Sequence, residues 1–202
     1  MIGIVNYGMG NIRSIESALK FLDANSKVLL SSKELKDCAK IILPGVGSYS
    51  KAIQNIDAYG WREPLNEFIS TNKPVLGICL GMQLFADFGE EGGESRGLGW
   101  IKGRVKKIST SNPDIKVPHI GFNTVQINQD NLLFRGLPSS LDFYFVHSYH
   151  FRCDNNHHVA ATVTHGEKLT AAVRRDALMG VQFHPEKSQK NGLKVLQNFI
   201  NS

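Results

Sequence analysis

One cysteine in the chain has the neighbours that a catalytic thiol requires. Cys79 lies in the segment at residues 74–85, PVLGICLGMQLF, with Gly77 two residues before it and Gly81 two residues after it. This is the spacing of a nucleophile elbow, in which a buried strand turns tightly into a helix and small residues leave room for the nucleophile. A helix predicted over residues 80–88 would favour the thiolate through its N-terminal dipole. The alternative is a buried structural cysteine, which the two glycines and the strand disfavour.

A cysteine nucleophile needs a base that takes its proton and returns it to the leaving amine. The segment at residues 180–186, GVQFHPE, offers a histidine, which titrates in the right range for this role. His184 ends an apolar strand, Pro185 stops that strand, and Glu186 is placed to hold the second ring nitrogen and fix its tautomer. The alternative is a histidine that ends a strand with its hydrogen bonds satisfied. His184 is favoured because a turn presents it.

A third segment, LPGVGS at residues 43–48, ends another apolar strand. Its glycines leave bare backbone amides at the carboxyl edge of the predicted sheet, where ligands bind in open α/β folds. Such amides suit an oxyanion that develops on an attacked carboxamide. On this segment alone, an ordinary tight turn is an equally good interpretation.

Taken together, the three segments resemble the signature segments of class I (triad-type) glutamine amidotransferases in order and spacing. Within that class, the chain resembles the glutaminase subunit of imidazole glycerol phosphate synthase over essentially its whole length. This narrower similarity is carried by residues 7–14 (YGMGNIRS), 97–100 (GLGW), 117–123 (VPHIGFN), 143–149 (FYFVHSY) and 183–188 (FHPEKS). Two positions depart from the usual pattern: Phe122 stands where tryptophan is common, and Asn6 where aspartate is common.

The resemblance implies a chemical role for each motif. Cys79 would attack the glutamine amide to give a γ-glutamyl thioester, His184 would protonate the departing ammonia and activate water, and Glu186 would orient the imidazole. The oxyanion hole would consist of backbone amides of Val46 or Gly47 and of Leu80. The two ends of the glutamine would be held by Gln83, His147, Ser148 and Tyr149. No cofactor and no metal are implied.

The resemblance also implies a partner. Asn11, Tyr144 and Lys187 would lie at the interface with a (β/α)8-barrel cyclase subunit in a heterodimer. Ammonia would reach a phosphoribulosyl-formimino-AICAR ribonucleotide in that subunit, giving imidazole glycerol phosphate and AICAR for histidine biosynthesis. The two departures leave open a paralogue that supplies ammonia to a surface-sugar amidating synthase. Two further alternatives are a free-standing cysteine hydrolase of γ-glutamyl compounds and a catalytically silent regulatory subunit, against which the intact triad argues.

The elements that must position these residues are those of an α/β fold. Short apolar strands at residues 2–5, 28–30, 41–43 and 74–78 alternate with helical segments such as 12–22, as in a parallel sheet buried on both faces. From about Gly99, strands at 101–108, 117–127, 143–146, 159–163, 169–173 and 179–182 follow closely, before a last helix at 191–200. We therefore expect a single domain over residues 1–202. It would be an open mixed sheet flanked by helices, with the elbow after a central parallel strand.

The amino-acid composition excludes several other classes of protein. With 42% hydrophobic and 20% charged residues among 202, the chain has the composition of a soluble globular protein. We expect neither a membrane span nor a secretory leader. Three widely spaced cysteines favour a reducing cytoplasm over a disulfide framework. The net charge of +5 is concentrated where Lys102, Arg104 and Lys106 alternate, which indicates an exposed strand face more than a phosphate site. Binding of nucleic acid is disfavoured, because aromatic residues do not alternate with these basic residues.

Overall fold

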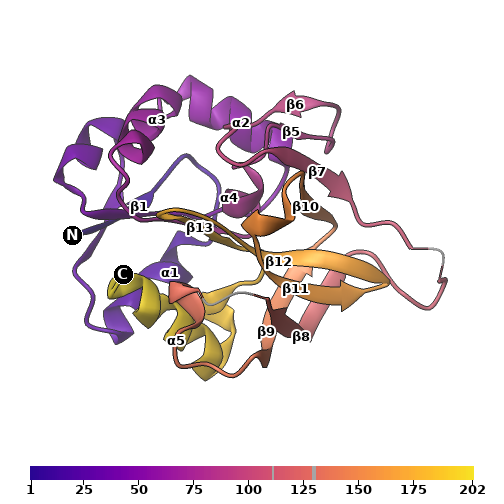
Figure 1. Cartoon of the computed structure of the whole chain (residues 1–202). Coiled ribbons are helices and arrows are strands. Elements are labelled where there is room, and N and C mark those ends of the chain that lie inside the picture. The colour runs from indigo at the N-terminus through magenta and orange to yellow at the C-terminus, as the bar shows by residue number, and fades with distance from the viewer. Residues whose placement is uncertain (111, 129–130) are drawn as a thin grey trace.

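The computed structural model describes residues 1–110, 112–128 and 131–202. Its centre is a nine-stranded sheet with the order β2-β1-β3-β4-β13-β12-β11-β8-β9 (Figure 1). The five strands from β2 to β13 pair in parallel, and the remaining pairs are antiparallel. The parallel strands are β1 (Ile2–Val5), β2 (Ser26–Leu29), β3 (Lys40–Leu43), β4 (Val75–Ile78) and β13 (Leu178–Val181). The antiparallel strands are β8 (His119–Ile127), β9 (Ser140–His147), β11 (Val159–His165) and β12 (Glu167–Arg175). The predicted mixed sheet is confirmed.

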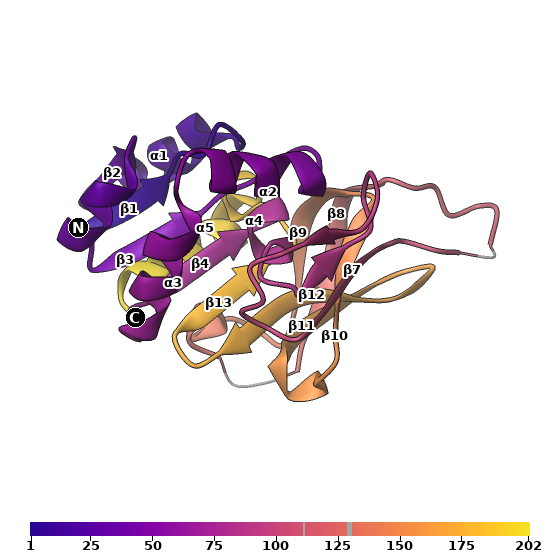
Figure 2. The same cartoon turned by 90° about the horizontal axis from the view of Figure 1, so that it is seen from above.

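Helices cover both faces of the parallel half. Helices α1 (Ile12–Phe21) and α5 (Gln189–Ile200) lie on one face, and α2 (Tyr49–Ala58) and α3 (Arg62–Ser70) lie on the other (Figure 1). Successive strand residues point to opposite faces. Ile42 of β3 therefore packs in the same core cluster as α1 and α5, while Ile41 and Leu43 belong to the cluster under α2 and α3. Figure 2 shows these helices gathered over the parallel half, with the antiparallel strands extending to the other side.

A second, four-stranded sheet with the order β10-β7-β5-β6 was not predicted. Its strands are β5 (Phe88–Gly89), β6 (Ser95–Arg96), β7 (Gly103–Lys107) and β10 (Tyr149–Cys153). At Ser148 the chain leaves β9 of the large sheet and continues as β10, which pairs with β7. The change of sheet brings the residues after β9 beside the carboxyl edge of the parallel strands, and it thereby shapes the site described below.

The predicted helix over residues 80–88 is wrong in its length. Helix α4 spans only Leu80–Gln83. The carbonyls of Leu84, Phe85 and Ala86, which could extend it, instead accept backbone hydrogen bonds from the loop at residues 98–101. These tertiary contacts satisfy the same groups that a longer helix would use. A single helical turn has only a small dipole, so the thiolate must be stabilised mainly by other groups.

The alternating basic residues near β7 are paired with carboxylates. Arg104 contacts Glu94 at 2.5 Å, and Lys106 lies 3.5 Å from Glu90. Lys102, just before the strand, contacts Asp87 at 2.8 Å. Each of the three therefore faces an acidic partner in or near the β5–β6 hairpin, which agrees with the expected exposed strand face.

Candidate active site

Cys79 occupies a strained turn directly after the central strand β4. Its backbone has φ 53° and ψ −111°, an uncommon conformation for a residue with a side chain. Its N–H donates to the carbonyl of Val181 on β13 at 2.8 Å, and its carbonyl accepts from the N–H of Gln83 at 3.2 Å. Bonds on both sides therefore fix the turn, and the strain is of the kind that surrounding structure maintains at functional sites.

The two glycines beside Cys79 are required by close backbone approach. A Cβ at Gly81 would lie 1.8 Å from the carbonyl oxygen of Leu43, at the end of β3. A Cβ at Gly77 would lie 2.5 Å from the Phe85 ring. The close packing of strand, turn and helix thus allows no side chain at either position. This is the spatial reason for the G-x-nucleophile-x-G spacing in the sequence.

We expect Gly81→Ala to lower the free energy of unfolding by more than about 3 kcal/mol, because backbone and not a flexible side chain occupies the space. The matched control is Gly60→Ala. Gly60 has a left-handed backbone conformation, with φ +67°, but a Cβ added there would have nothing within 4 Å. Gly60→Ala should lower the free energy of unfolding by only about 1–2 kcal/mol, which is the cost of placing a side chain on a left-handed backbone. Urea unfolding of both variants measures the difference; equal losses would contradict the steric explanation.

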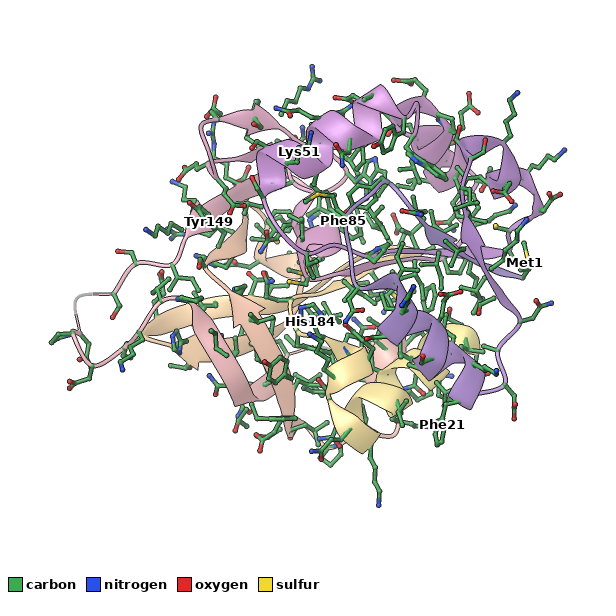
Figure 3. The ribbon with its side chains drawn as sticks, turned by 180° about the vertical axis from the view of Figure 1, so that it is seen from behind. Met1, Phe21, Lys51, Phe85, Tyr149 and His184 are labelled. Carbon is green, nitrogen blue, oxygen red and sulfur yellow. The ribbon has the colours of Figure 1, made fainter. Side chains whose placement is uncertain are left out.

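His184 and Glu186 form a buried pair after β13. Pro185 opens the short 3-10 turn η4 (Pro185–Lys187), and this turn folds the carboxylate back so that Glu186 Oε1 lies 2.8 Å from His184 Nδ1. Both side chains are only 1% exposed. The backbone of His184 is held as well, because its N–H donates to the carbonyl of Tyr144 and its carbonyl accepts from the Ser188 hydroxyl. In Figure 3, His184 lies near the middle of the molecule, close to α1 and α5.

The surroundings of His184 favour its protonated form. Burial lowers the pKa of the imidazole, but hydrogen bonding and charge interaction with Cys79 and Glu186 outweigh burial and raise the pKa to about 10. A carboxylate can only accept, so Nδ1–H donates to Glu186. The other ring nitrogen, Nε2, is buried and has no well-aligned hydrogen-bond partner among the described residues. The same ring interacts with the side chain of Cys79. This nitrogen is therefore available for proton transfer.

The turn after β3 lies across from Cys79 and is tied to the N-terminal segment. The Tyr7 hydroxyl donates to the carbonyl of Pro44 at 2.6 Å. Gly47 has φ +107°, and a Cβ there would lie 2.9 Å from the Met9 side chain. The turn before α1 thus contacts the turn that carries the expected oxyanion donors. Burial, and then the charge on Cys79, raise the pKa of Tyr7, so its hydroxyl stays protonated as a donor.

A cavity of about 430 Å³ opens at the nucleophile. It is lined by residues that the sequence predicted for the oxyanion hole and for glutamine, together with others from the surrounding loops. The lining residues are Val46, Gly47, Ser48, Cys79, Leu80, Gln83, Glu91, Pro118, Val146, His147, Ser148 and Tyr149. A cavity of this size can hold a free glutamine.

Two of the expected glutamine-binding side chains already have protein partners. Gln83 Nε2 donates to the carbonyl of Tyr149 at 2.8 Å and to Gln182 Oε1 at 3.0 Å. The imidazole of His147 is buried, with Nδ1 2.8 Å from that same carbonyl and Nε2 2.9 Å from His119. Burial lowers the pKa of His147 to about 3. At His147, contact with glutamine would therefore have to come from the backbone.

The expected interface residues lie on neighbouring elements. Lys187 Nζ is 5.8 Å from the ring centre of Tyr144, and Ser188 joins the two segments by accepting the N–H of Tyr144 at 2.9 Å. Asn11 precedes α1, which packs against the η4 turn that contains Lys187. The structure thus brings Tyr144 and Lys187 into contact and places Asn11 on an adjoining element.

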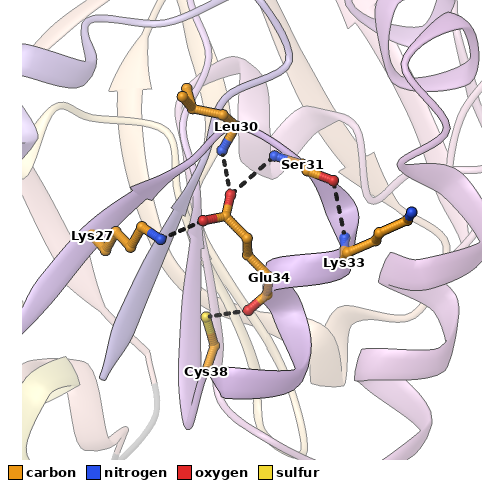
Figure 4. A network of polar contacts seen from close by, with 6 residues as sticks. All are labelled: Lys27, Leu30, Ser31, Lys33, Glu34 and Cys38. Carbon is orange, nitrogen blue, oxygen red and sulfur yellow. Dashed lines mark hydrogen bonds and ion pairs between the residues drawn. The ribbon is translucent and has the colours of Figure 1, made fainter.

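The other two cysteines differ from Cys79 in their surroundings. Figure 4 shows the network that fixes Cys38: its thiol donates to the carbonyl of Glu34 at 3.5 Å. The Glu34 carboxylate in turn accepts from Lys27 and from the N–H groups of Leu30 and Ser31. Burial raises the pKa of Cys38, and burial raises the pKa of Cys153 to about 12. A high pKa keeps a thiol protonated and unreactive.

Two residues of the site were missed in the sequence. Gln182, fully buried, has its Nε2 3.6 Å from Cys79 Sγ. Its signal was a polar residue at the end of an apolar strand, two positions before His184. Tyr7 begins the segment at residues 7–14 that carries part of the family resemblance, but no role was assigned to it. Within the described part of the chain, no group of three or more His, Cys, Asp or Glu residues is arranged to hold a metal ion. In that same part, every helix is too short or too polar to serve as a membrane span.

The chain is similar to known proteins over nearly its whole length. The family model described as "Glutamine amidotransferase class-I" matches residues 3–202. The protein called imidazole glycerol phosphate synthase subunit HisH from Leptospira interrogans is 44% identical over 202 residues, covering 98% of each chain. The protein of the same name from Pelagibacter ubique is 41% identical, covering 99% of each.

Solved structures agree on the fold. The structure of PurLQS from Thermotoga maritima superposes with a TM-score of 0.76 at 18% identity, covering 99% of this chain and 97% of that one. A crystal structure of a glutamine amidotransferase, also from Thermotoga maritima, gives a TM-score of 0.67 at 18% identity, covering 94% of this chain and 77% of that one.

Proposed function

The chain belongs to the class-I glutamine amidotransferases, in the family of the imidazole glycerol phosphate synthase subunit HisH, and we propose that it releases ammonia from glutamine for that synthase. The family assignment confirms the resemblance seen in the sequence. The observation that carries the chemical proposal is the buried His184–Glu186 pair beside Cys79, whose strained turn opens onto a cavity of suitable size. The full-length relatives named HisH favour the histidine pathway over a sugar-amidating synthase.

The first half of the reaction forms a thioester. Cys79 Sγ attacks the side-chain carbonyl of glutamine, and the oxyanion is held by backbone N–H groups of Leu80 and of Val46 or Gly47. His184 gives a proton from Nε2 to the departing nitrogen, so that ammonia leaves and a γ-glutamyl thioester remains on Cys79. In the second half, Nε2 takes a proton from water while the resulting hydroxide attacks the thioester. The intermediate then collapses to release the Cys79 thiolate and glutamate, which restores the pair of thiolate and protonated imidazole. Glu186 keeps the imidazole in the required orientation through Nδ1.

A partner surface is suggested by an apolar strip beside the cavity. Across the β8–β9 pair, Ile120 lies opposite Val146 and Phe122 opposite Tyr144. Ile120 is 60% exposed and Phe122 50% exposed, while Phe143 and Phe145 on the other face of β9 are fully buried. We call Ile120, Phe122, Tyr144 and Val146 the β8–β9 strip. It runs from the cavity, which Val146 lines, to Lys187.

Exposed apolar patches next to a site mark a docking surface. The β8–β9 strip, Lys187 and Asn11 would together face the (β/α)8-barrel cyclase subunit that the family resemblance implies, in a heterodimer. Ammonia formed in the cavity would then pass into the partner without crossing bulk water. All three cysteines are free, which fits a reducing compartment, and we place the chain in the cytoplasm on this ground.

We expect the isolated chain to hydrolyse glutamine slowly and the complex with cyclase and its phosphorylated acceptor to be faster by about 10²–10³-fold. The physical reason lies in the turn at residues 44–47, whose peptide between Val46 and Gly47 can turn over at low cost because Gly47 tolerates positive φ. An N–H directed at the oxyanion supports catalysis, and a carbonyl opposes it. Contacts of Met9 and Tyr7 with this turn connect it to the interface side.

The measurement is steady-state glutamate release by the chain alone, with the cyclase subunit, and with cyclase plus acceptor. A cyclase preparation without acceptor separates complex formation from acceptor binding. Equal rates in all three conditions would contradict gating and favour a free-standing hydrolase.

A further inference from the structure

Gln182 connects the nucleophile to the floor of the glutamine site. Its side chain is fully buried, its Nε2 lies 3.6 Å from Cys79 Sγ, and its Oε1 accepts from Gln83 Nε2 at 3.0 Å. The backbone N–H of Gln182 donates to the carbonyl of Ala171 on β12 at 2.8 Å, so the residue is fixed at both ends. The triad mechanism leaves this carboxamide without a role.

The orientation of the Gln182 amide follows from the neighbouring acceptors. The carbonyl of Tyr149 can only accept, so Gln83 must direct its NH2 group towards it. The second hydrogen of that NH2 group then donates to Gln182, which must present its oxygen. The NH2 group of Gln182 is left facing the sulfur. The opposite orientation would set two NH2 groups against each other.

A chain of neutral histidines holds the Tyr149 carbonyl in place. His147 Nδ1–H donates to this carbonyl, so its Nε2 accepts from His119 Nδ1–H at 2.9 Å. His119 Nε2 then accepts from Asn123 Nδ2 at 3.0 Å. Burial lowers the pKa of His119 to about 4 and that of His147 to about 3, so both rings are neutral at physiological pH. Donors and acceptors therefore alternate without conflict from Asn123 on β8 to the sulfur.

We propose that the Gln182 carboxamide is part of the catalytic machinery, as an N–H donor that stabilises the Cys79 thiolate and aims its sulfur. A thiolate is a pure acceptor with a full charge, so an N–H group stabilises it more than it stabilises a thiol. Such a donor supplies what the four-residue helix α4 cannot supply through its dipole. The inference rests on the proposed function in that Cys79 is taken as the nucleophile.

The groups facing Cys79 must be kept constant in any test. They are His184, whose imidazole interacts with the thiol, and the protonated hydroxyl of Tyr7, while Glu91 lines the same cavity. A change at Gln182 leaves all three residues in place. Gln182→Met keeps a long unbranched side chain and removes the donor. Gln182→Glu keeps the shape and replaces the donor by an oxygen.

The test is the rate at which iodoacetamide alkylates Cys79 in the full chain, followed by peptide mass spectrometry from about pH 5 to pH 10. Peptide mass spectrometry assigns each alkylation to its own cysteine, and burial raises the pKa of Cys38 and of Cys153. For Gln182→Met we expect the midpoint of the profile to rise by about one pH unit, which corresponds to about 1.4 kcal/mol. Alkylation well below the midpoint should fall about tenfold. Gln182→Glu should raise the midpoint at least as far.

Turnover should fall with the thiolate fraction while KM for glutamine changes less. The matched control is Thr170→Val, which removes a buried polar group on β12, where Thr170 is 8% exposed. It should leave the midpoint unchanged. A folded Gln182→Met variant with an unchanged midpoint would overturn the proposal, even if its melting temperature falls. If that variant does not fold, an unchanged or lowered midpoint in Gln182→Glu overturns it instead. Alkylation needs no glutamine turnover, so failure of the glutaminase proposal would be seen separately.

Discussion

Cys79→Ser should lower glutamine hydrolysis by at least about 10⁴-fold, the scale seen when a nucleophile of a catalytic triad is removed. A serine hydroxyl has a far higher pKa than a thiol, and the site is arranged for a thiolate beside a protonated imidazole. The substitution is nearly isosteric, so the turn at φ 53° and its backbone hydrogen bonds should persist. Glutamate release, assayed with the cyclase and its acceptor present, is the measurement.

Two controls make this result specific. Cys153→Ser, at a half-buried cysteine outside the cavity, should keep nearly full activity. The Cys79→Ser complex should still form product when ammonium salt is added, because the acceptor chemistry is assigned to the partner. Full glutamine hydrolysis in Cys79→Ser would contradict the assignment of the nucleophile. Loss of ammonium-dependent synthesis would instead indicate a damaged complex.

The second large effect on turnover is expected at the buried pair of His184 and Glu186. His184→Ala should lower turnover by about 10³–10⁴-fold, because no other group replaces Nε2 as proton carrier. Glu186→Ala should cost less, about 10–10²-fold, since the imidazole remains and loses only its hydrogen-bond partner at Nδ1, 2.8 Å away. Turnover of both variants at saturating glutamine gives the comparison.

His150→Ala is the matched control, since His150 is also buried but does not line the cavity. It should retain most of the activity. Circular dichroism and a melting curve for each variant separate lost chemistry from lost folding, because a buried charge or a cavity lowers stability by itself. A larger loss in Glu186→Ala than in His184→Ala would show that the two roles are assigned wrongly.

The motifs could be predicted because the local backbone geometry requires their residue types. Gly77 and Gly81 are dictated by backbone contacts that no side chain permits, so they mark the turn in the sequence itself. The apolar runs of β1, β3 and β4 likewise report strands buried on both faces. Such signals need no knowledge of distant residues.

Long-range contacts set the features that could not be predicted. Helix α4 ends at Gln83 because the loop at residues 98–101 takes the carbonyls that would extend it. Strand β10 exists because Tyr149–Cys153 pairs with β7 after the chain changes sheet at Ser148. The ring of His147 is held by His119, 28 positions away in sequence, and by the carbonyl of Tyr149. Gln182 and Tyr7 gain their roles from atoms that lie far along the chain.

The central claim is that Cys79 is the nucleophile towards glutamine, and a glutamine analogue carrying a diazoketone in place of the amide tests it most directly. Such a compound alkylates the thiolate that would attack the amide. In the complex with cyclase and acceptor, we expect one label per chain, on the Cys79 peptide, with glutamine slowing the labelling in proportion to its occupancy of the site. Label on Cys38 or Cys153, or label on Cys79 at a rate that glutamine does not change, would contradict the account.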